Sequence, residues 1–148
     1  MIKEDGFTTF LLKAKKNTYA AHGAEVASTR PSSHDLQYTE DDYMYYDTYL
    51  GGAKFSGEEA VWEKDKPIWC MNYSGRVIGE DFSGDFLKEA LMEVPKEMPY
   101  RGPEIYENGE YRYECEVSGE LEWFQGYERI YKLGTQIYEC YFHGGEVQ

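Results

Sequence analysis

A few tyrosine, aspartate and arginine side chains have the chemistry and spacing to bind a small molecule. Tyr45 and Asp47 are two residues apart in a stretch with strand-like alternation, so their side chains share one face. A guanidinium group beside Asp47 would hold its carboxylate ionised, and tyrosine hydroxyls would complete a polar floor. We therefore predict one pocket for a small anionic or aromatic ligand, formed by Tyr45, Asp47, Tyr73, Arg76 and Arg101.

The two arginines of this predicted pocket lie in segments where the backbone can turn. Arg76 follows Gly75, where the backbone could bend and direct a side chain back over a sheet. Arg101 lies in segment 95–103, PKEMPYRGP, which contains three prolines and reads as an irregular crossing. Guanidinium groups at both positions could clamp a ligand bidentately. In an acidic chain they could equally be internal salt-bridge partners, and this alternative stays open.

Motifs for metal binding or catalysis are absent from the sequence. The three histidines are far apart, and no cysteine lies at ligand spacing to another. The nucleophile motif Gly-x-Ser-x-Gly and the glycine-rich phosphate loops are also absent. The cysteines occupy predicted strand positions, which favour buried, inert thiols: Cys70, Cys115 and Cys140. We expect no metal and no cofactor, and we assign no catalytic residue. An enzyme with a dispersed polar site remains an alternative, although the sequence favours a protein without catalysis.

Composition restricts the partners of the chain. Its 148 residues carry a formal net charge of −13, and such a chain repels phosphate backbones, so direct nucleic-acid binding is not expected. No apolar run approaches 18 residues, so no membrane span is predicted, and the N-terminus lacks the apolar core of a signal peptide. Three unpaired cysteines suit a reducing compartment, and we expect the cytoplasm. An acidic protein-interaction module and a homodimer are alternatives that the charge leaves open.

The central element is a predicted β-hairpin over residues 58–77. In its second strand Trp69, Met71 and Tyr73 share one face. The opposite face carries Ile68, Cys70 and Asn72. Because both faces carry apolar bulk, we predict a central strand that is covered on both sides, with Trp69 buried.

Two helices are predicted from apolar stripes at helical spacing. The first spans residues 6–16, and its stripe is Phe7, Phe10, Leu11 and Ala14. The second begins after Ser83, a plausible N-cap, and stops before Pro95. Segment 17–35, between the first helix and the first strand, has no sustained period and is predicted to be a long loop.

Alternation in the rest of the chain predicts further strands. Residues 36–50 read as a hairpin, and residues 111–143 read as an antiparallel meander. Within this meander we expect a turn at Ser118-Gly119 and a break at Gln125-Gly126. The predicted fold is α+β: one domain over residues 1–148, with a curved antiparallel sheet of about six to eight strands and two helices packed on one face.

A set of short motifs, in order along the chain, is similar to an uncharacterised prokaryotic domain family. The motifs are STRPSSHDLQY, YYDTYLGG, FSGEEAVW, PIWCMNYSGRV, FLKEAL, YRGPE and YECYFHGG, and they extend from about Phe10 to Gly145. That family occurs alone or behind helix-turn-helix regulator domains, so the resemblance implies a sensor or effector-type module. It has no established activity and transfers no catalytic residue. Only one short helix is predicted before residue 17, which argues against direct DNA binding. The leading hypothesis is a small-ligand-binding module with a pocket rich in tyrosine and tryptophan.

Overall fold

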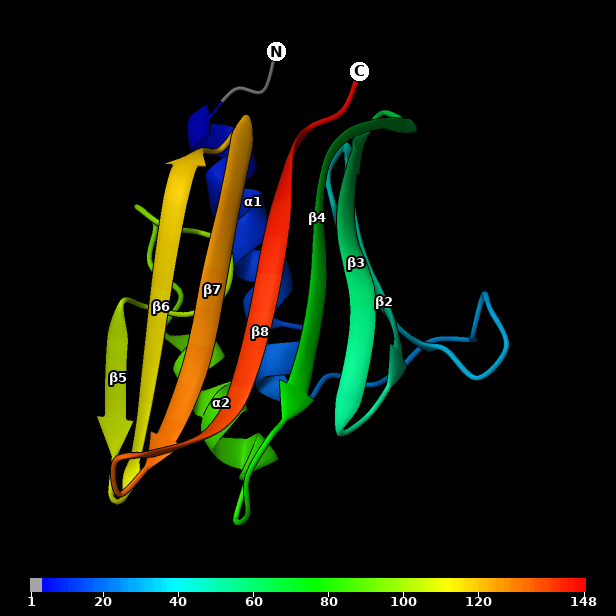
Figure 1. Cartoon of the computed structure of the whole chain (residues 1–148). Helices are drawn as coiled ribbons and strands as arrows, with labels where there is room; N and C mark the ends of the chain where they lie inside the picture. Colours follow the sequence, from blue (N-terminus) through cyan, green and yellow to red (C-terminus); the bar gives the residue numbers. More distant parts are fainter. Residues whose placement is uncertain (1–3) are drawn as a thin grey trace.

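Two four-stranded meanders join along one edge each and form a single antiparallel sheet (Figure 1). The computed structural model describes residues 4–148. The first meander consists of β1 (His34–Glu40), β2 (Tyr43–Gly51), β3 (Lys54–Glu63) and β4 (Lys66–Val77). The second consists of β5 (Ile105–Asn108), β6 (Tyr111–Glu120), β7 (Trp123–Lys132) and β8 (Thr135–Glu146). Because β4 pairs with β8, the strand order is β1-β2-β3-β4-β8-β7-β6-β5. The predicted α+β class with an antiparallel sheet is confirmed.

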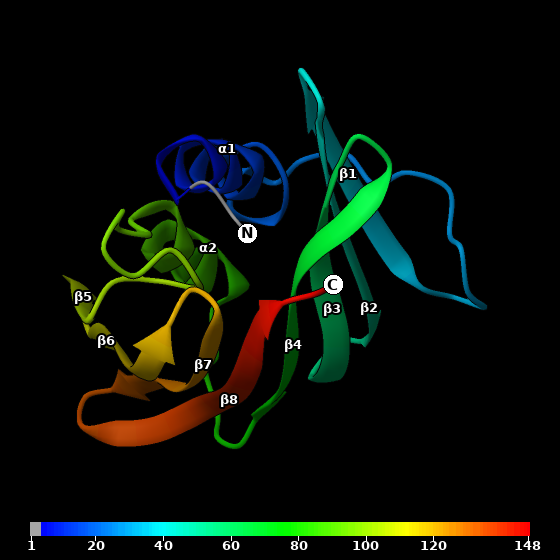
Figure 2. The same cartoon turned by 90° about the horizontal axis from the view of Figure 1, so that it is seen from above.

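The helices lie on one face of this sheet, inside its curve (Figure 2). They are α1 (Glu4–Lys16), the short 3-10 helix η1 (Tyr19–Ala21) and α2 (Gly84–Met92). All four residues of the predicted α1 stripe are buried, so its packing role is confirmed. Ser83 caps α2 as predicted: its hydroxyl accepts a hydrogen bond from the backbone N–H of Phe86 at 3.1 Å. The connection from β4 to β5 contains α2 and segment 95–103, and it brings both to the helix side.

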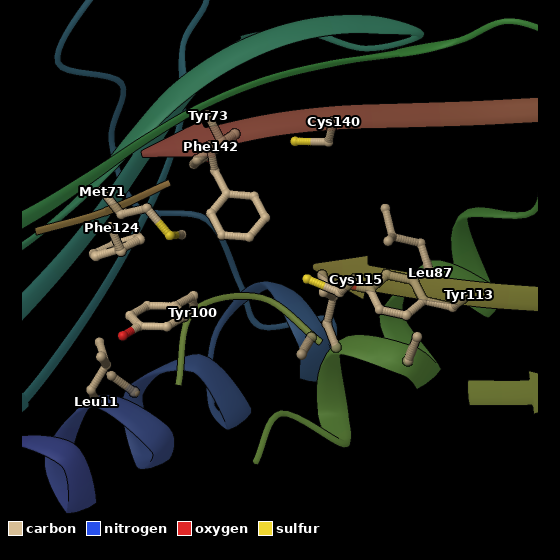
Figure 3. Close-up of a cluster of buried hydrophobic side chains, with 14 of the residues drawn as sticks. Leu11, Met71, Tyr73, Leu87, Tyr100, Tyr113, Cys115, Phe124, Cys140 and Phe142 are labelled. Atoms are coloured by element: carbon tan, nitrogen blue, oxygen red, sulfur yellow. The ribbon is translucent and has the colours of Figure 1, made fainter. Parts of the chain in front are cut away.

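Aromatic side chains dominate the core between the sheet and the helices. Trp69 is fully buried, as predicted, and its indole N–H donates to the carbonyl oxygen of Leu121 at 3.2 Å. Its ring contacts Phe7 edge-on at 5.7 Å and stacks on Phe124 at 5.8 Å between centroids. Figure 3 shows Phe124 beside Tyr100. The rings of these two residues stack with 4.1 Å between their centroids. The β4 strand is thus anchored in the centre of the core.

The opposite face of β4 has no helix over it. Cys70 and Asn72 on that face are only partly buried, so the prediction of a strand covered on both sides is wrong. The reason is topological: one connection carries both α2 and the crossing to the same side as α1. Part of the 17–35 loop covers the outer strand instead, where Val26 forms a bridge to Asp35. This bridge protects the β1 edge from pairing with another chain.

Two predicted interruptions of the second meander are absent. Strand β6 continues through Ser118 to Glu120, and β7 continues through Gly126. Gly126 lies beneath the ring of Phe142, which a Cβ atom at that position would overlap. The glycine therefore serves packing rather than a turn. The short strand β5 was not predicted, whereas the hairpin turn between β3 and β4 lies at Lys64-Asp65, inside the hairpin predicted over residues 58–77.

In the part of the chain that the structure describes, neither α-helix combines the length and the apolar character needed to cross a bilayer.

Candidate functional site

A cavity of about 460 Å³ lies between the sheet and the helical layer. Strands β1, β2, β3, β4 and β8 contribute one wall, and α1, η1, α2 and segment 95–103 contribute the other. Most of its lining is aromatic or aliphatic, with a few charged groups among the rings. The exposed residues Gly51, Gly52 and Ala53 also line it, so the cavity reaches the surface at the β2–β3 turn. This volume lies in the range of roughly 300–1,000 Å³ that is typical of small-molecule sites.

Four of the five residues predicted to share a pocket line this cavity. Tyr45 and Asp47 come from β2, Tyr73 comes from β4, and Arg101 comes from the crossing between α2 and β5. All four are buried. Alternation along β2 places Tyr45 and Asp47 on the helix side together, as the sequence predicted. Whether they bind a ligand stays a prediction.

Arg76 is the fifth predicted residue, and it does not line the cavity. It is an odd number of positions from Tyr73 in the same strand, so its side chain projects from the opposite face of the sheet. There its Nε donates to Oε2 of Glu139 at 2.7 Å, and the side chain is 58% exposed. Gly75 does not direct Arg76 toward the pocket. It makes room for the ring of Phe55, which would overlap a Cβ atom there.

The polar end of the cavity contains two carboxyl groups on neighbouring strands. Asp47 in β2 and Glu59 in β3 are directly paired, and both side chains face the helices. Glu59 Oε1 accepts hydrogen bonds from Lys15 Nζ at 2.6 Å and from the Tyr45 hydroxyl at 2.5 Å. Asp47 Oδ1 accepts one from the Tyr73 hydroxyl at 2.5 Å. We name these five residues, Lys15, Tyr45, Asp47, Glu59 and Tyr73, the Asp47 cluster.

Arg101 does not pair with Asp47, which corrects the expectation that a guanidinium group would hold this carboxyl ionised. Its Nε and Nη2 donate to the two carboxylate oxygens of Glu128, at 3.1 and 2.6 Å. Glu128 also accepts hydrogen bonds from the hydroxyls of Tyr113 at 2.5 Å and Tyr138 at 2.7 Å. We name these four residues the Glu128 cluster. The guanidinium of Arg101 lies 5.2 Å from the ring centroid of Tyr73, so the two clusters adjoin.

Asp47 consequently has an unusual protonation equilibrium. Burial and the charge of Glu59 raise the pKa of Asp47 from 3.8 to about 7, although the Tyr73 hydrogen bond and the charges of Lys15 and Arg101 oppose this. Burial also lowers the pKa of Lys15, with Glu59 opposing that change. Asp47 therefore changes its charge near neutral pH, inside a cavity.

One oxygen of Asp47 remains available to a ligand. Among residues 4–148, Oδ2 of Asp47 accepts no hydrogen bond, since Tyr73 donates to Oδ1. No fully buried side-chain oxygen or nitrogen in the same range lacks a hydrogen-bond partner. It follows that Oδ2 is not fully buried, and because Asp47 lines the cavity, this oxygen is reached from there.

Sequence reasoning missed two charged groups of the site. Lys15 lies in the last turn of α1, where a positive charge suits the helix dipole, but its side chain is buried and donates a hydrogen bond to Glu59. Glu59 belongs to the pair Glu58-Glu59, of which only one member can face a given pocket. The register of β2 against β3 decides which one, because it pairs Glu59 with Asp47. That register was the one signal that could have identified Glu59 as the member of the pair that faces the cavity.

Other reactive groups do not form a second centre in the described residues. No set of three or more histidine, cysteine, aspartate or glutamate side chains in residues 6–148 is arranged to hold a metal ion. Cys115 and Cys140 are buried and Cys70 is half-buried. Burial raises the pKa of Cys70 to about 11 and those of Cys115 and Cys140 to about 12, so all three are protonated at neutral pH.

Comparison with known proteins places the chain in a family. A family model described as "Domain of unknown function (DUF5680)" matches residues 47–147. The chain belongs to the DUF5680 family. The resemblance to an uncharacterised domain family is thereby confirmed, over a shorter range than the motifs suggested. The DUF5680 region runs from Asp47 to Val147, just past the end of β8, so it contains Asp47, Glu59, Tyr73 and Arg101, whereas Lys15 and Tyr45 precede it. No curated protein and no solved structure matches the chain.

Proposed function

We propose that this protein binds a small, largely apolar or aromatic molecule in the cavity between its sheet and its helices. The cavity itself carries the proposal. Protein interiors are close-packed, and voids much larger than a water molecule are few. A space of about 460 Å³ that opens to the surface and is walled by rings is the kind of site that small molecules occupy.

The distribution of polar groups supports a binding site over a packing defect. A defect would have an apolar lining, whereas this cavity contains Lys15, Asp47, Glu59 and Arg101 at its inner end. Both basic groups already form ion pairs, with Glu59 and Glu128. A ligand would therefore meet aromatic walls and one carboxyl group, that of Asp47, which has no basic partner among the described residues. An apolar body with a single polar group fits this arrangement.

A sensor or effector role follows from where the ligand would lie. The cavity is lined on one side by strands and on the other by α1, η1 and α2, so an occupant would contact both layers at once. A ligand that binds the folded state stabilises it by RT ln(1 + [L]/Kd), about 2.7 kcal/mol at a hundredfold excess over Kd. Occupancy would thus tighten the packing of the helices on the sheet, and a partner that contacts the helices could detect it.

Blocking the entrance tests the proposal. Ala53 is exposed and lines the cavity, so Ala53→Trp should narrow the entrance without burying a new side chain in the core. Ala24→Trp is the matched control, because Ala24 is also exposed but does not line the cavity. Native mass spectrometry of freshly purified protein should show a retained small molecule in the unmodified chain and in Ala24→Trp, and much less in Ala53→Trp. Equal retention in all three proteins would contradict binding in this cavity.

A second candidate function is proton transfer to or from a bound molecule. The observation that favours it is the pair of carboxyl groups on neighbouring strands, one of which has its pKa raised to about 7. A base with a pKa near the working pH is well suited to general acid–base chemistry. If the retained molecule contains an acidic C–H bond, incubation in D₂O should place deuterium on that carbon with the unmodified protein and not with Asp47→Asn. Identical deuterium content with both proteins would exclude this role for Asp47.

A further inference from the structure

The charges around the cavity do not balance, because the carboxyl group of Asp47 has no basic partner among the described residues. Three carboxyl groups and two basic groups lie at its inner end or directly behind it. Lys15 pairs with Glu59 at 2.6 Å, and Arg101 pairs with Glu128 at 2.6 Å. Within residues 4–148, Asp47 has no basic partner within ion-pair distance. Its one hydrogen bond comes from the neutral hydroxyl of Tyr73.

We propose that the ligand of this cavity carries a single positive charge, an alkylammonium or amidinium group on an aromatic body, and that this charge pairs with the free oxygen of Asp47. This inference rests on the proposed binding function and adds the chemical class of the ligand. A cation at this position would give Asp47 the partner that Glu59 and Glu128 already have. A charge-assisted hydrogen bond in a cavity of low dielectric constant is stronger than one in water.

The aromatic lining supports the same choice. Tyr49, Phe55, Tyr73 and Tyr138 line the cavity along with Asp47. Aromatic rings attract cations through their quadrupole and repel anions from their faces. An anionic ligand would need a free basic group, but the basic residues that line the cavity, Lys15, His34 and Arg101, each lie within ion-pair distance of a glutamate. A cation would therefore supply the counter-charge that Asp47 lacks. An anion would instead place a second negative charge beside Asp47.

The binding of such a cation must depend on the protonation of Asp47. The charged and titratable groups that face Asp47 are Glu59 from β3, Tyr73 from β4, Lys15 from α1, Tyr19 from η1 and Arg101 from the crossing. Tyr45 and Tyr49 lie on its own strand. With the pKa of Asp47 at about 7, the carboxyl is mostly protonated at pH 6 and mostly ionised at pH 8. A cation should then bind about tenfold more weakly at pH 6 than at pH 8, and its binding at pH 6 should release close to one proton.

Three probes with one indole ring and different charges test this inference: tryptamine, tryptophol and indoleacetate. At pH 8 tryptamine is a cation, tryptophol is neutral and indoleacetate is an anion. Isothermal titration calorimetry gives their affinities, and repetition in two buffers of different ionisation enthalpy gives the protons released. We expect tryptamine to bind at least about tenfold more tightly than tryptophol, indoleacetate to bind most weakly, and tryptamine alone to release a proton at pH 6.

Two variants assign the effect to Asp47. Asp47→Asn should remove the preference for tryptamine and its proton release, and should change the affinity for tryptophol by less than about threefold. Glu58→Gln is the control: this carboxyl is next to Glu59 in sequence but is not among the residues that line the cavity, so the variant should keep the preference. The affinity for tryptophol also shows that Asp47→Asn has kept its fold.

The outcomes separate the two proposals. If tryptophol binds and Ala53→Trp abolishes its binding, but tryptamine is not preferred or its preference persists in Asp47→Asn, the inferred positive charge is overturned and binding in the cavity stands. If indoleacetate binds most tightly, the inferred charge is overturned in the same way. If none of the three probes binds and Ala53→Trp changes nothing, the proposed binding function fails, and the inference about charge fails with it.

Discussion

The Glu128 cluster and the Asp47 cluster use the same types of side chain on the same face of one sheet. Glu128 is fully buried and accepts four hydrogen bonds, two from Arg101 and one each from Tyr113 and Tyr138. Asp47 is 4% exposed and accepts one, from Tyr73. Glu128 has a basic partner and does not line the cavity, whereas Asp47 has none and does. The number of partners, rather than burial, distinguishes the two carboxyl groups.

This difference separates the structural role of Glu128 from the ligand-binding role that we propose for Asp47. A buried charge is tolerated when its hydrogen bonds and its counter-charge are all supplied by the protein, as they are at Glu128. A buried carboxyl without a counter-charge destabilises the folded protein, and its presence is then explained by something that the protein binds or does. Neutralising the carboxyl group of Asp47 and that of Glu128 should therefore change stability in opposite directions.

The largest effect is expected at Glu128. Glu128→Gln keeps the shape of the side chain but leaves Arg101 buried without a counter-charge. Removal of one partner from a buried ion pair costs about 3–5 kcal/mol, so the free energy of unfolding in urea should fall by that amount. Glu107→Gln is the control, because Glu107 forms an exposed pair with Arg112, and such pairs contribute about 0–1 kcal/mol. Similar losses in the two variants would show that Glu128 has no special structural role.

Asp47→Asn should change the free energy of unfolding in the opposite direction. The folded protein holds the Asp47 proton more tightly than the unfolded chain does, because the pKa of Asp47 is about 7 when folded and about 3.8 when unfolded. Its contribution to stability is therefore full below pH 4 and is lost as the pH rises toward 7. That loss amounts to up to about 4 kcal/mol at about 1.36 kcal/mol per pH unit.

Asparagine does not titrate, so the stability of Asp47→Asn relative to the unmodified protein should increase between pH 4 and pH 8 by up to this amount. Urea denaturation at a series of pH values measures it. Asp35→Asn provides the contrast on the other face of the sheet. Burial raises the pKa of Asp35, but hydrogen bonds from Thr29, Ser33, Tyr46 and Thr48 outweigh this and hold the pKa well below 3.8. The folded protein stabilises the Asp35 carboxylate, so Asp35→Asn should be less stable than the unmodified protein by a nearly constant amount between pH 4 and pH 8. Equal pH profiles for the two variants would contradict the distinction.

A smaller effect should follow from removing one hydroxyl at each cluster. Tyr73→Phe deletes the only hydrogen bond of Asp47 from the described residues, and the pKa of Asp47 should rise further, since that bond lowers it. Carboxyl carbon NMR measures this titration, and the expected cost in stability is about 1–2 kcal/mol. Tyr138→Phe is the control, because Glu128 keeps its bonds from Arg101 and Tyr113. The control should leave the titration of Asp47 nearly unchanged.

The sequence predicted the fold better than the ends of its strands. Apolar alternation and helical stripes depend on local residue order, so they located the hairpin of β3 and β4 and the buried faces of α1 and α2. Glycines misled the assignment at Gly119 and Gly126. A glycine that makes room for a ring on a neighbouring strand has the same local signature as a glycine in a turn. The ring of Phe142 that explains Gly126 is 16 positions away in sequence.

For the site, the sequence identified strand neighbours but could not identify ion-pair partners. Alternation within β2 and β4 fixes which residues face the helices, and Tyr45, Asp47 and Tyr73 therefore line one cavity. Arg101, which lies in the crossing, lines the same cavity. The partner of each charge depends on register and on the path of the crossing. Glu59 reaches Asp47 through the pairing of β2 with β3, and Lys15 reaches Glu59 across the layers. Neither contact has a local signal in the sequence.

The smallest effect is expected at Arg76, and it decides whether the site is confined to one face of the sheet. Arg76 is an odd number of positions from Tyr73 in β4 and pairs with Glu139 on the surface. Such an exposed pair contributes about 0–1 kcal/mol, so Arg76→Gln should scarcely change the urea midpoint and should leave the affinities for tryptamine and tryptophol unchanged. Arg101→Gln is the informative companion, because it should cost stability in the same range as Glu128→Gln, about 3–5 kcal/mol. If Arg76→Gln instead weakened the binding of either probe about tenfold at unchanged stability, the binding site would have to include the face that carries Arg76, and the cavity could not be the whole site.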